Sequence, residues 1–207
     1  MHQGPQLEAQ SRLFVQQRFE IAEWLGFETR NKYAILDQQE RQIGFAAEQG
    51  RGFLGLLMRQ FLGHLRTFEI LFYTADRQLF LRALHPFRFY FHRLEIADSV
   101  TGRNLGAMQR RFALLHKTFD VSNAQGQVIL EVSSPLWKPW TFPFKRQGRE
   151  VACIRKKWSG VFFEAMTDKD RFMIEYSEGG MKEDERRLIL AAALFIDLLY
   201  FEVKARS

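Results

Sequence analysis

One short segment of the sequence holds carboxylates at a spacing that could bind a metal ion. Asp168 and Asp170 alternate with other residues, as in the first half of a calcium-binding loop. Such loops gather oxygen ligands because calcium is a hard cation. The sixth position, which needs glycine, is Met173, and the twelfth, which needs a bidentate acid, is Gly179. The segment therefore predicts a solvated turn between strands, with any calcium bound weakly.

Motifs for covalent or phosphate chemistry are absent from the sequence. It contains no nucleophile elbow, no phosphate-binding loop and no HExxH segment. The five histidines are scattered, and their spacing predicts neither a metal site nor a catalytic site. The single cysteine, Cys153, excludes an intrachain disulfide and indicates a reducing compartment. We therefore expect a protein that is not an enzyme.

The charge of the chain favours an anionic partner. Lys and Arg number 30 against 24 Asp and Glu, which gives a net charge of +6 and a pI of about 9.6. This bias suits either a lipid surface or nucleic acid and does not decide between them. The competing interpretation is a basic surface without a particular partner.

Two segments combine basic residues with apolar or aromatic ones. Residues 52–63 are apolar and rich in glycine, and residues 135–140 carry two tryptophans. Segments of this kind touch membranes, where tryptophan prefers the interface. The competing interpretations are a short helix that caps a barrel and tryptophans that close its mouth. The basic residues in or beside these segments are the predicted lipid-binding residues: Arg51, Arg59, Arg66, Lys138 and Lys145.

The elements that would carry these residues are organised around residues 188–201. This stretch is apolar all round as a helix, and Asp197 is its only charge. A helix without a polar stripe belongs in a core or in a membrane. Its 14 residues span roughly 21 Å, which is short of the roughly 30 Å hydrocarbon core. We therefore expect a buried helix, with a single membrane span as the alternative.

The rest of the chain repeats one pattern, in which an apolar run meets a polar turn and a second apolar run follows. Residues 119–130 are one example, and the same pattern recurs at residues 33–45, 68–81, 94–105 and 142–151. Serial antiparallel hairpins must close or stack to hide their edges. We expect a mainly β fold, a closed antiparallel barrel around the C-terminal helix. Residues 12–207 would form one domain after a flexible tail over residues 1–11; a sandwich with the helix outside is the alternative.

Several stretches resemble the phospholipid scramblase family, which belongs to the tubby-like and LURP-one-related superfamily. Order and spacing agree over residues 24–202. The most specific part of the resemblance is KWSG followed by TDKD and then by FID before FE. The stretches are FETRNKY at 27–33, IGFAAE at 43–48, KWSGV at 157–161, EAMTDKD at 164–170 and LFIDLLYFE at 194–202.

The resemblance implies a twelve-stranded barrel that encloses its C-terminal helix. It also implies binding of anionic membrane phospholipids and calcium-modulated transfer of lipid between leaflets, by a cytoplasmic protein peripheral at the inner face of the membrane. The alternative is a non-catalytic scaffold for protein or nucleic acid. The positions that match the family's calcium segment are Asp168, Asp170, Phe172, Ile174 and Tyr176. The missing late acidic ligand leaves weakly bound calcium as the only cofactor we expect.

Overall fold

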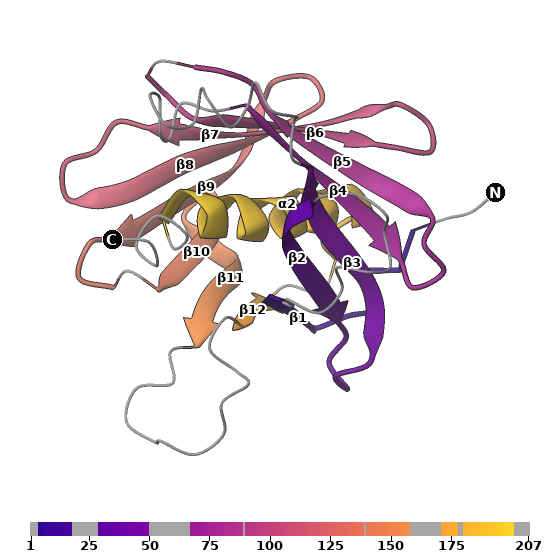
Figure 1. The fold of residues 1–207 in the computed structure, drawn as a ribbon. Coiled ribbons are helices and arrows are strands. Elements are labelled where there is room, and N and C mark those ends of the chain that lie inside the picture. Colours follow the sequence, from indigo (N-terminus) through magenta and orange to yellow (C-terminus); the bar gives the residue numbers. More distant parts are fainter. Residues whose placement is uncertain are drawn as a thin grey trace.

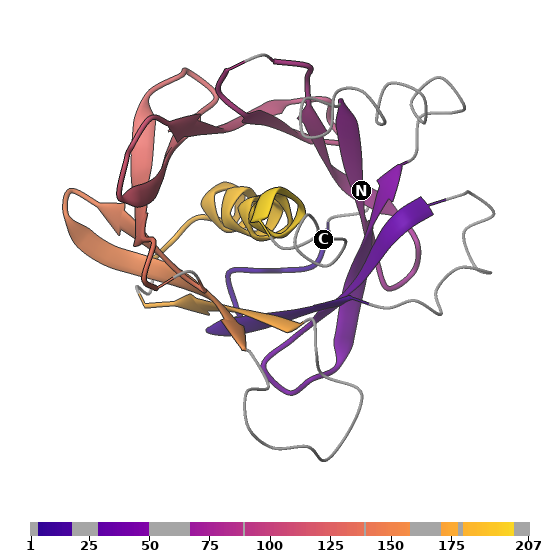
Figure 2. The same cartoon turned by 60° about the vertical axis from the view of Figure 1, so that its left-hand side comes forward.

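The structure is a closed antiparallel barrel that holds a single helix along its interior (Figures 1 and 2). It is a computed structural model that describes residues 4–17, 29–49, 67–88, 90–138, 140–157, 171–177 and 180–200. The described part of the chain contains twelve strands, and each pairs with its neighbour in sequence. The barrel closes where the first strand pairs with the last. This confirms the predicted fold class and excludes the sandwich.

The twelve strands follow one another around the barrel, and each is antiparallel to both of its neighbours. They are β1 (Arg12–Gln17), β2 (Thr29–Leu36), β3 (Gln42–Gln49), β4 (Phe68–Thr74), β5 (Leu79–His85), β6 (Arg93–Asp98), β7 (Asn104–Arg111), β8 (His116–Asn123), β9 (Val128–Pro135), β10 (Thr141–Arg146), β11 (Arg149–Lys157) and β12 (Arg171–Tyr176). The helix is α2 (Glu183–Tyr200). Each of the five repeats in the sequence is a hairpin, from β2–β3 to β10–β11.

The inward side chains of the strands and the whole middle of α2 form one core. Every residue of α2 from Arg186 to Leu198 is buried. Period-two alternation sends Phe119 and Val121 of β8 inward, where both are fully buried. The apolar helix is therefore enclosed by the barrel, as its sequence predicted.

The two ends of the barrel are built differently. At one end the hairpins turn within a few polar residues; we call it the turn end, formed by residues 37–41, 75–78, 99–103, 124–127 and 147–148. At the other end the described connections are richer in aromatic residues; we call it the loop end. Its described connections are residues 86–92, 112–115 and 136–140, apart from Phe89 and Pro139.

Ion pairs fix the start of α2 at the turn end. Arg187 reaches Asp98 at the end of β6 at 2.7 Å. Asp184 and Glu185, in the first turn of α2, pair with Arg103 at 2.9 Å and Arg146 at 2.8 Å; carboxylates are also favoured there by the helix dipole. The helix therefore runs from the turn end to the loop end.

Residues 4–10, from the segment predicted to be a flexible tail, lie against this end of the barrel. Leu7 is fully buried, and its backbone N–H donates a hydrogen bond to the carboxylate of Glu183 at 2.9 Å. The Arg186 guanidinium donates to the Leu7 carbonyl at 2.9 Å. An apolar side chain and two satisfied polar groups thus hold this segment in place beside the start of α2.

Candidate functional site

The loop end exposes large apolar side chains that belong to two adjacent connections. In the β7–β8 connection, Phe112 is 76% exposed and Leu114 is 79% exposed; Trp137, in the β9–β10 connection, is 68% exposed. The backbone N–H of Leu136 donates to the Leu115 carbonyl at 3.1 Å, so the two connections lie side by side. We call these five exposed residues the apolar patch: Phe112, Leu114, Leu115, Leu136 and Trp137.

The β5–β6 connection adds aromatic residues to the same end. Phe87, Tyr90 and Phe91 are exposed, and the register of β6 on β7 sets Arg93 opposite Gln109, next to the start of the β7–β8 connection. Of the ten exposed large hydrophobic side chains among the described residues, eight lie at the loop end. The other two, Val100 and Val128, lie at the turn end. Exposed apolar surface concentrated in this way is typical of a docking site.

Charge is distributed as unevenly as apolar surface. Residues 86–92, 110–117 and 136–140 contain no Asp or Glu. The turns of the opposite end mix both signs, with Asp37, Glu40 and Asp76 beside Arg41, Arg77 and Arg103. These three segments therefore place positive charge next to the apolar patch. Its cations in these three segments are Arg88, Arg110, Arg111, Lys117 and Lys138.

Two of these cations meet the last residue of α2 in the mouth of the barrel. The Lys117 ammonium lies 4.3 Å from the centroid of the Tyr200 ring, and the Arg110 guanidinium lies 5.9 Å from it. Phe119 and Phe142 pack against the same ring, with centroids 6.2 and 6.3 Å away. Burial raises the pKa of the Tyr200 phenol, and the charge of Arg110 opposes that shift.

The one charge in the apolar part of α2 is neutralised inside the barrel. Asp197 accepts a hydrogen bond of 2.7 Å from the Tyr33 hydroxyl of β2. The Lys156 ammonium of β11 lies 3.4 Å from the other carboxylate oxygen and 4.7 Å from the Phe172 ring. Both charged side chains are almost fully buried. A buried charge persists only when paired and hydrogen-bonded, and these partners supply both.

The structure also brings together two histidines that the sequence left unconnected. The Nε2 atom of His85 lies 3.1 Å from Nδ1 of His92, and both side chains are buried. The ring of Phe68 stacks on His85 with centroids 4.6 Å apart. The available signal was the alternation of β5, in which Leu81, Ala83 and His85 share the inward face. It predicts that His85 is buried but not that His92 is its partner.

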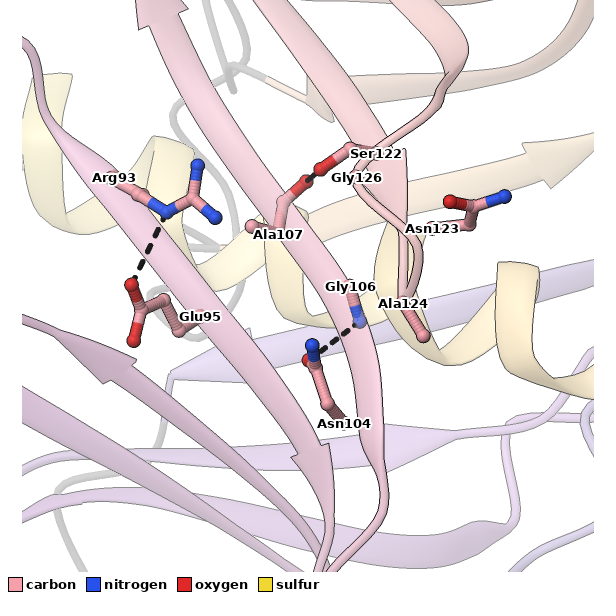
Figure 3. A pocket seen from close by; sticks show the side chains of 9 residues that line it. All are labelled: Arg93, Glu95, Asn104, Gly106, Ala107, Ser122, Asn123, Ala124 and Gly126. Atoms are coloured by element: carbon pink, nitrogen blue, oxygen red, sulfur yellow. Dashed lines mark hydrogen bonds and ion pairs between the residues drawn. The ribbon is translucent and has the colours of Figure 1, made fainter.

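A polar pocket of about 250 Å³ opens on the outer wall of the barrel (Figure 3). It forms where the small residues of its lining, such as Gly106, Ala107 and Ser122, leave room between larger side chains. Arg93 and Glu95, on its rim, pair at 3.2 Å. The lining residues are Arg93, Glu95, Asn104, Gly106, Ala107, Ser122, Asn123, Ala124 and Gly126. The pocket is separate from the apolar patch, and its groups suit a small polar molecule.

The residues predicted to bind calcium are only partly described. Phe172, Ile174 and Tyr176 lie in β12 with buried side chains, and Tyr176 donates its hydroxyl to the Arg186 carbonyl at 3.5 Å. Asp168 and Asp170 lie outside the described residues. Within the described ranges no group of three or more His, Cys, Asp or Glu side chains could hold a metal ion. The weak calcium site thus stays a prediction.

The residues predicted to bind lipid are not all gathered in one place. Lys138 is exposed at the loop end, whereas Lys145 lies toward the turn end, opposite Glu131 and Glu150 in the strand register. Arg51, Arg59 and Arg66 lie outside the described residues. Sequence reasoning missed Arg110, Lys117 and the β7–β8 leucines. The signal for them was the run RRFALLHK at 110–117, which mixes basic and apolar residues without an acid.

The described part of the chain contains no helix long and apolar enough to cross a membrane.

Comparison with known proteins connects this chain to one family. The family model described as Scramblase matches residues 3–203. The chain is similar to a phospholipid scramblase family protein of Schizosaccharomyces pombe, with 24% identity over 94% of this chain and 60% of that protein. It is also similar to human phospholipid scramblase 1, with 26% identity over 92% of this chain and 63% of that protein. The chain thus spans less than two thirds of the length of these two relatives.

A solved structure and a further relative were also found. A crystal structure of an Arabidopsis thaliana protein is 11% identical with a TM-score of 0.47, covering 95% of this chain and 91% of that chain. The Saccharomyces cerevisiae protein named altered inheritance rate of mitochondria protein 25 is 22% identical over 89% of this chain and 68% of that protein.

Proposed function

Because this chain belongs to the scramblase family, we propose that it binds anionic phospholipid membranes through its loop end and promotes transfer of phospholipid between leaflets. The observation that carries the proposal is the coincidence of the apolar patch with cations in three segments that contain no acid, residues 86–92, 110–117 and 136–140. Binding is the first step, and the geometry supports it directly. Transfer of phospholipid between leaflets is proposed because the similar proteins are named phospholipid scramblases.

The attraction to the membrane has two parts. Each cation near an anionic leaflet contributes about 1 kcal/mol, so the exposed Arg88, Arg110 and Lys138 contribute up to roughly 3 kcal/mol at low salt. Arg111 is already paired with Asp120 at 3.2 Å. The leucines and aromatic rings of the apolar patch add burial in the interface, which does not depend on salt. Binding is therefore reversible and weakens as the Debye length shrinks.

The location of α2 restricts how lipid meets the protein. The helix fills the barrel, and its residues from Arg186 to Leu198 are buried. We therefore place lipid at the loop end, outside the core. Because anionic lipids give the cytoplasmic leaflet its negative potential, we propose a peripheral protein at the inner face of the membrane.

Vesicle pelleting tests the proposal. The protein should sediment with phosphatidylserine vesicles, remain in solution with phosphatidylcholine vesicles, and be released by salt. Leu114→Ser with Trp137→Ser should weaken sedimentation. Val100→Ser with Val128→Ser, which removes two exposed apolar groups from the turn end, should leave it unchanged.

Two results would overturn the proposal. One is equal sedimentation with both kinds of vesicle, or with neither. The other is the same loss for the two double variants. Binding to DNA or to a protein that Leu114→Ser with Trp137→Ser leaves intact would support the scaffold instead. A fluorescent-lipid assay in the same vesicles measures transfer separately from binding.

A further inference from the structure

The polar pocket on the outer wall (Figure 3) spans three neighbouring strands. Glu95 of β6, Ala107 of β7 and Ser122 of β8 lie opposite one another in the strand register, and all three line the pocket. The small side chain of Ala107 leaves a hollow between Glu95 and Ser122. Asn104 and part of the β8–β9 turn close the side toward the turn end. The pocket therefore opens on the side of the barrel, separate from the apolar patch.

A β-bulge in β7 shapes this pocket. The register of β6 on β7 shifts here, so that Leu105 is an extra residue between Asn104 and Gly106. Gly106 has a φ of +147°, and a Cβ atom there would collide with the Ser122 carbonyl, so only glycine fits. The Asn104 side-chain oxygen accepts the Gly106 N–H at 3.0 Å, which fixes the amide at the edge of the pocket. Bulges re-aim side chains and are common beside active sites.

The lining presents both hydrogen-bond donors and acceptors to a ligand. The Arg93 guanidinium donates to Glu95 at 3.2 Å through Nε and to Gln109 at 3.0 Å through Nη1. Among the described residues, no hydrogen bond occupies the second carboxylate oxygen of Glu95, Nη2 of Arg93 or the NH2 group of Asn104. The Ser122 hydroxyl donates to a β7 carbonyl at 3.4 Å, so its lone pairs can accept.

We propose that this pocket binds one ring of a neutral polyhydroxy compound, a monosaccharide unit. A hydroxyl group both donates and accepts, so neighbouring hydroxyls match a lining that mixes the two roles. The charges of Arg93 and Glu95 cancel, so the lining does not select for a charged ligand. The volume of about 250 Å³ lies below the roughly 300–1,000 Å³ of pockets for larger ligands, which limits the ligand to a single ring.

Two other occupants are less compatible with the geometry. A zwitterion such as an amino acid would have to separate Arg93 from Glu95 to bind both charges, whereas hydroxyls use the atoms that the ion pair leaves free. Water alone would fill the hollow without any preference for one ligand over another. The inference goes beyond the proposed function, because the pocket stays open to solvent when the loop end lies on a membrane.

The test is a titration of the purified protein with D-glucose, D-galactose and D-mannose, followed by calorimetry or saturation-transfer NMR. Galactose and mannose each differ from glucose in the orientation of a single hydroxyl, so a built site should prefer one of the three. Affinity in the roughly millimolar range is expected for a ligand this small. Glu95→Ala should weaken binding about tenfold or more, as expected for hydrogen bonds to a charged group.

Two further variants locate the binding. Ala107→Leu fills the pocket from its floor and should abolish binding; if it also lowers the melting temperature, Glu95→Ala decides alone. Glu131→Ala is the matched control, because Glu131 is an exposed carboxylate on the same outer wall, outside both the pocket and the loop end. It should change the affinity less than twofold. Circular dichroism and melting temperature check the fold of each variant.

The outcomes separate this inference from the proposed function. No saturable binding of any of the three sugars overturns it, as does wild-type affinity in Glu95→Ala or an equal loss in Glu131→Ala. Leu114→Ser with Trp137→Ser, which should impair vesicle pelleting, should bind the preferred sugar like the wild type, so either proposal can fail alone. The methyl glycoside of that sugar identifies the source: equal affinity assigns the pocket to a sugar linked to a larger molecule, and weaker affinity assigns it to the free sugar.

Discussion

Replacing Lys156 by methionine should destabilise the barrel, because it removes the cation that lies 3.4 Å from the buried Asp197 carboxylate. The side chains of Lys156 and Asp197 are only 6% and 3% exposed, and their charged atoms lie 3.4 Å apart. At an effective dielectric constant of about 20 this separation gives roughly 5 kcal/mol of attraction, which the cost of desolvating both ions largely offsets. Removing one partner of such a pair costs about 3–5 kcal/mol.

The measurement is thermal or urea unfolding of the variant beside the wild type. For a chain of this length a loss of 3 kcal/mol lowers Tm by roughly 6–12 °C. The double variant Lys156→Met with Asp197→Leu should recover most of the loss, because it removes both charges from the core. Lys145→Met is the control, since Lys145 lies on the outer wall and should tolerate the change.

Two results would refute the reasoning. If Lys156→Met melts like the wild type, Asp197 does not depend on the lysine for its charge. If the double variant is as unstable as the single one, the loss comes from packing around the lysine stem and not from the loss of the Lys156–Asp197 ion pair.

Three other predictions follow from the core and from the sequence. Leu194→Asp should unfold the protein, because an unpaired charge at a fully enclosed position costs several kcal/mol; an unchanged melting temperature would contradict the position of α2 in the core. Calcium affinity should lie in the roughly 10⁻⁴ to 10⁻³ M range or be undetectable by calorimetry, and micromolar binding that Asp170→Asn abolishes would contradict this. Burial raises the pKa of the Cys153 thiol to about 11 from 9.0, so the unfolded chain loses this proton first as the pH rises. The stability of the wild type should therefore fall relative to Cys153→Ala between about pH 9 and pH 11, and parallel urea midpoints across that range would disprove it.

Periodicity in the sequence was sufficient for most of the fold. The alternation around Phe119 and the all-round apolarity of residues 188–201 show which side chains must be buried away from water. A barrel closed around the helix buries all of them. The same alternation, which points Ala152 and Ile154 of β11 inward, also directs Lys156 into the core. It could not identify Tyr33 as a partner of Asp197, because the two residues are 164 positions apart and meet only once the barrel closes.

The candidate site was harder to predict because its residues come from separate strands and connections that meet only in the folded barrel. Trp137 and Lys138 were found from their composition, whereas Lys145 was grouped with them although strand β10 carries it toward the other end. Arg110 looks like one member of an ordinary basic pair until the register places it in the mouth beside Tyr200. Neighbours across strands are set by register, which a single sequence specifies only weakly.

The seam between β1 and β12 determines when this barrel can form during synthesis. Arg12 pairs with Glu175, and the Leu7 N–H meets Glu183, 176 positions later. One edge of β1 therefore stays unpaired until β12 has left the ribosome, and the barrel lacks its central helix until α2 has followed. Contacts of such long range make folding slow and leave strand edges exposed to aggregation meanwhile. A ribosome-bound chain that stops before Glu183 should thus be sensitive to protease and dependent on chaperones, and it should gain protection abruptly once residues 183–200 emerge.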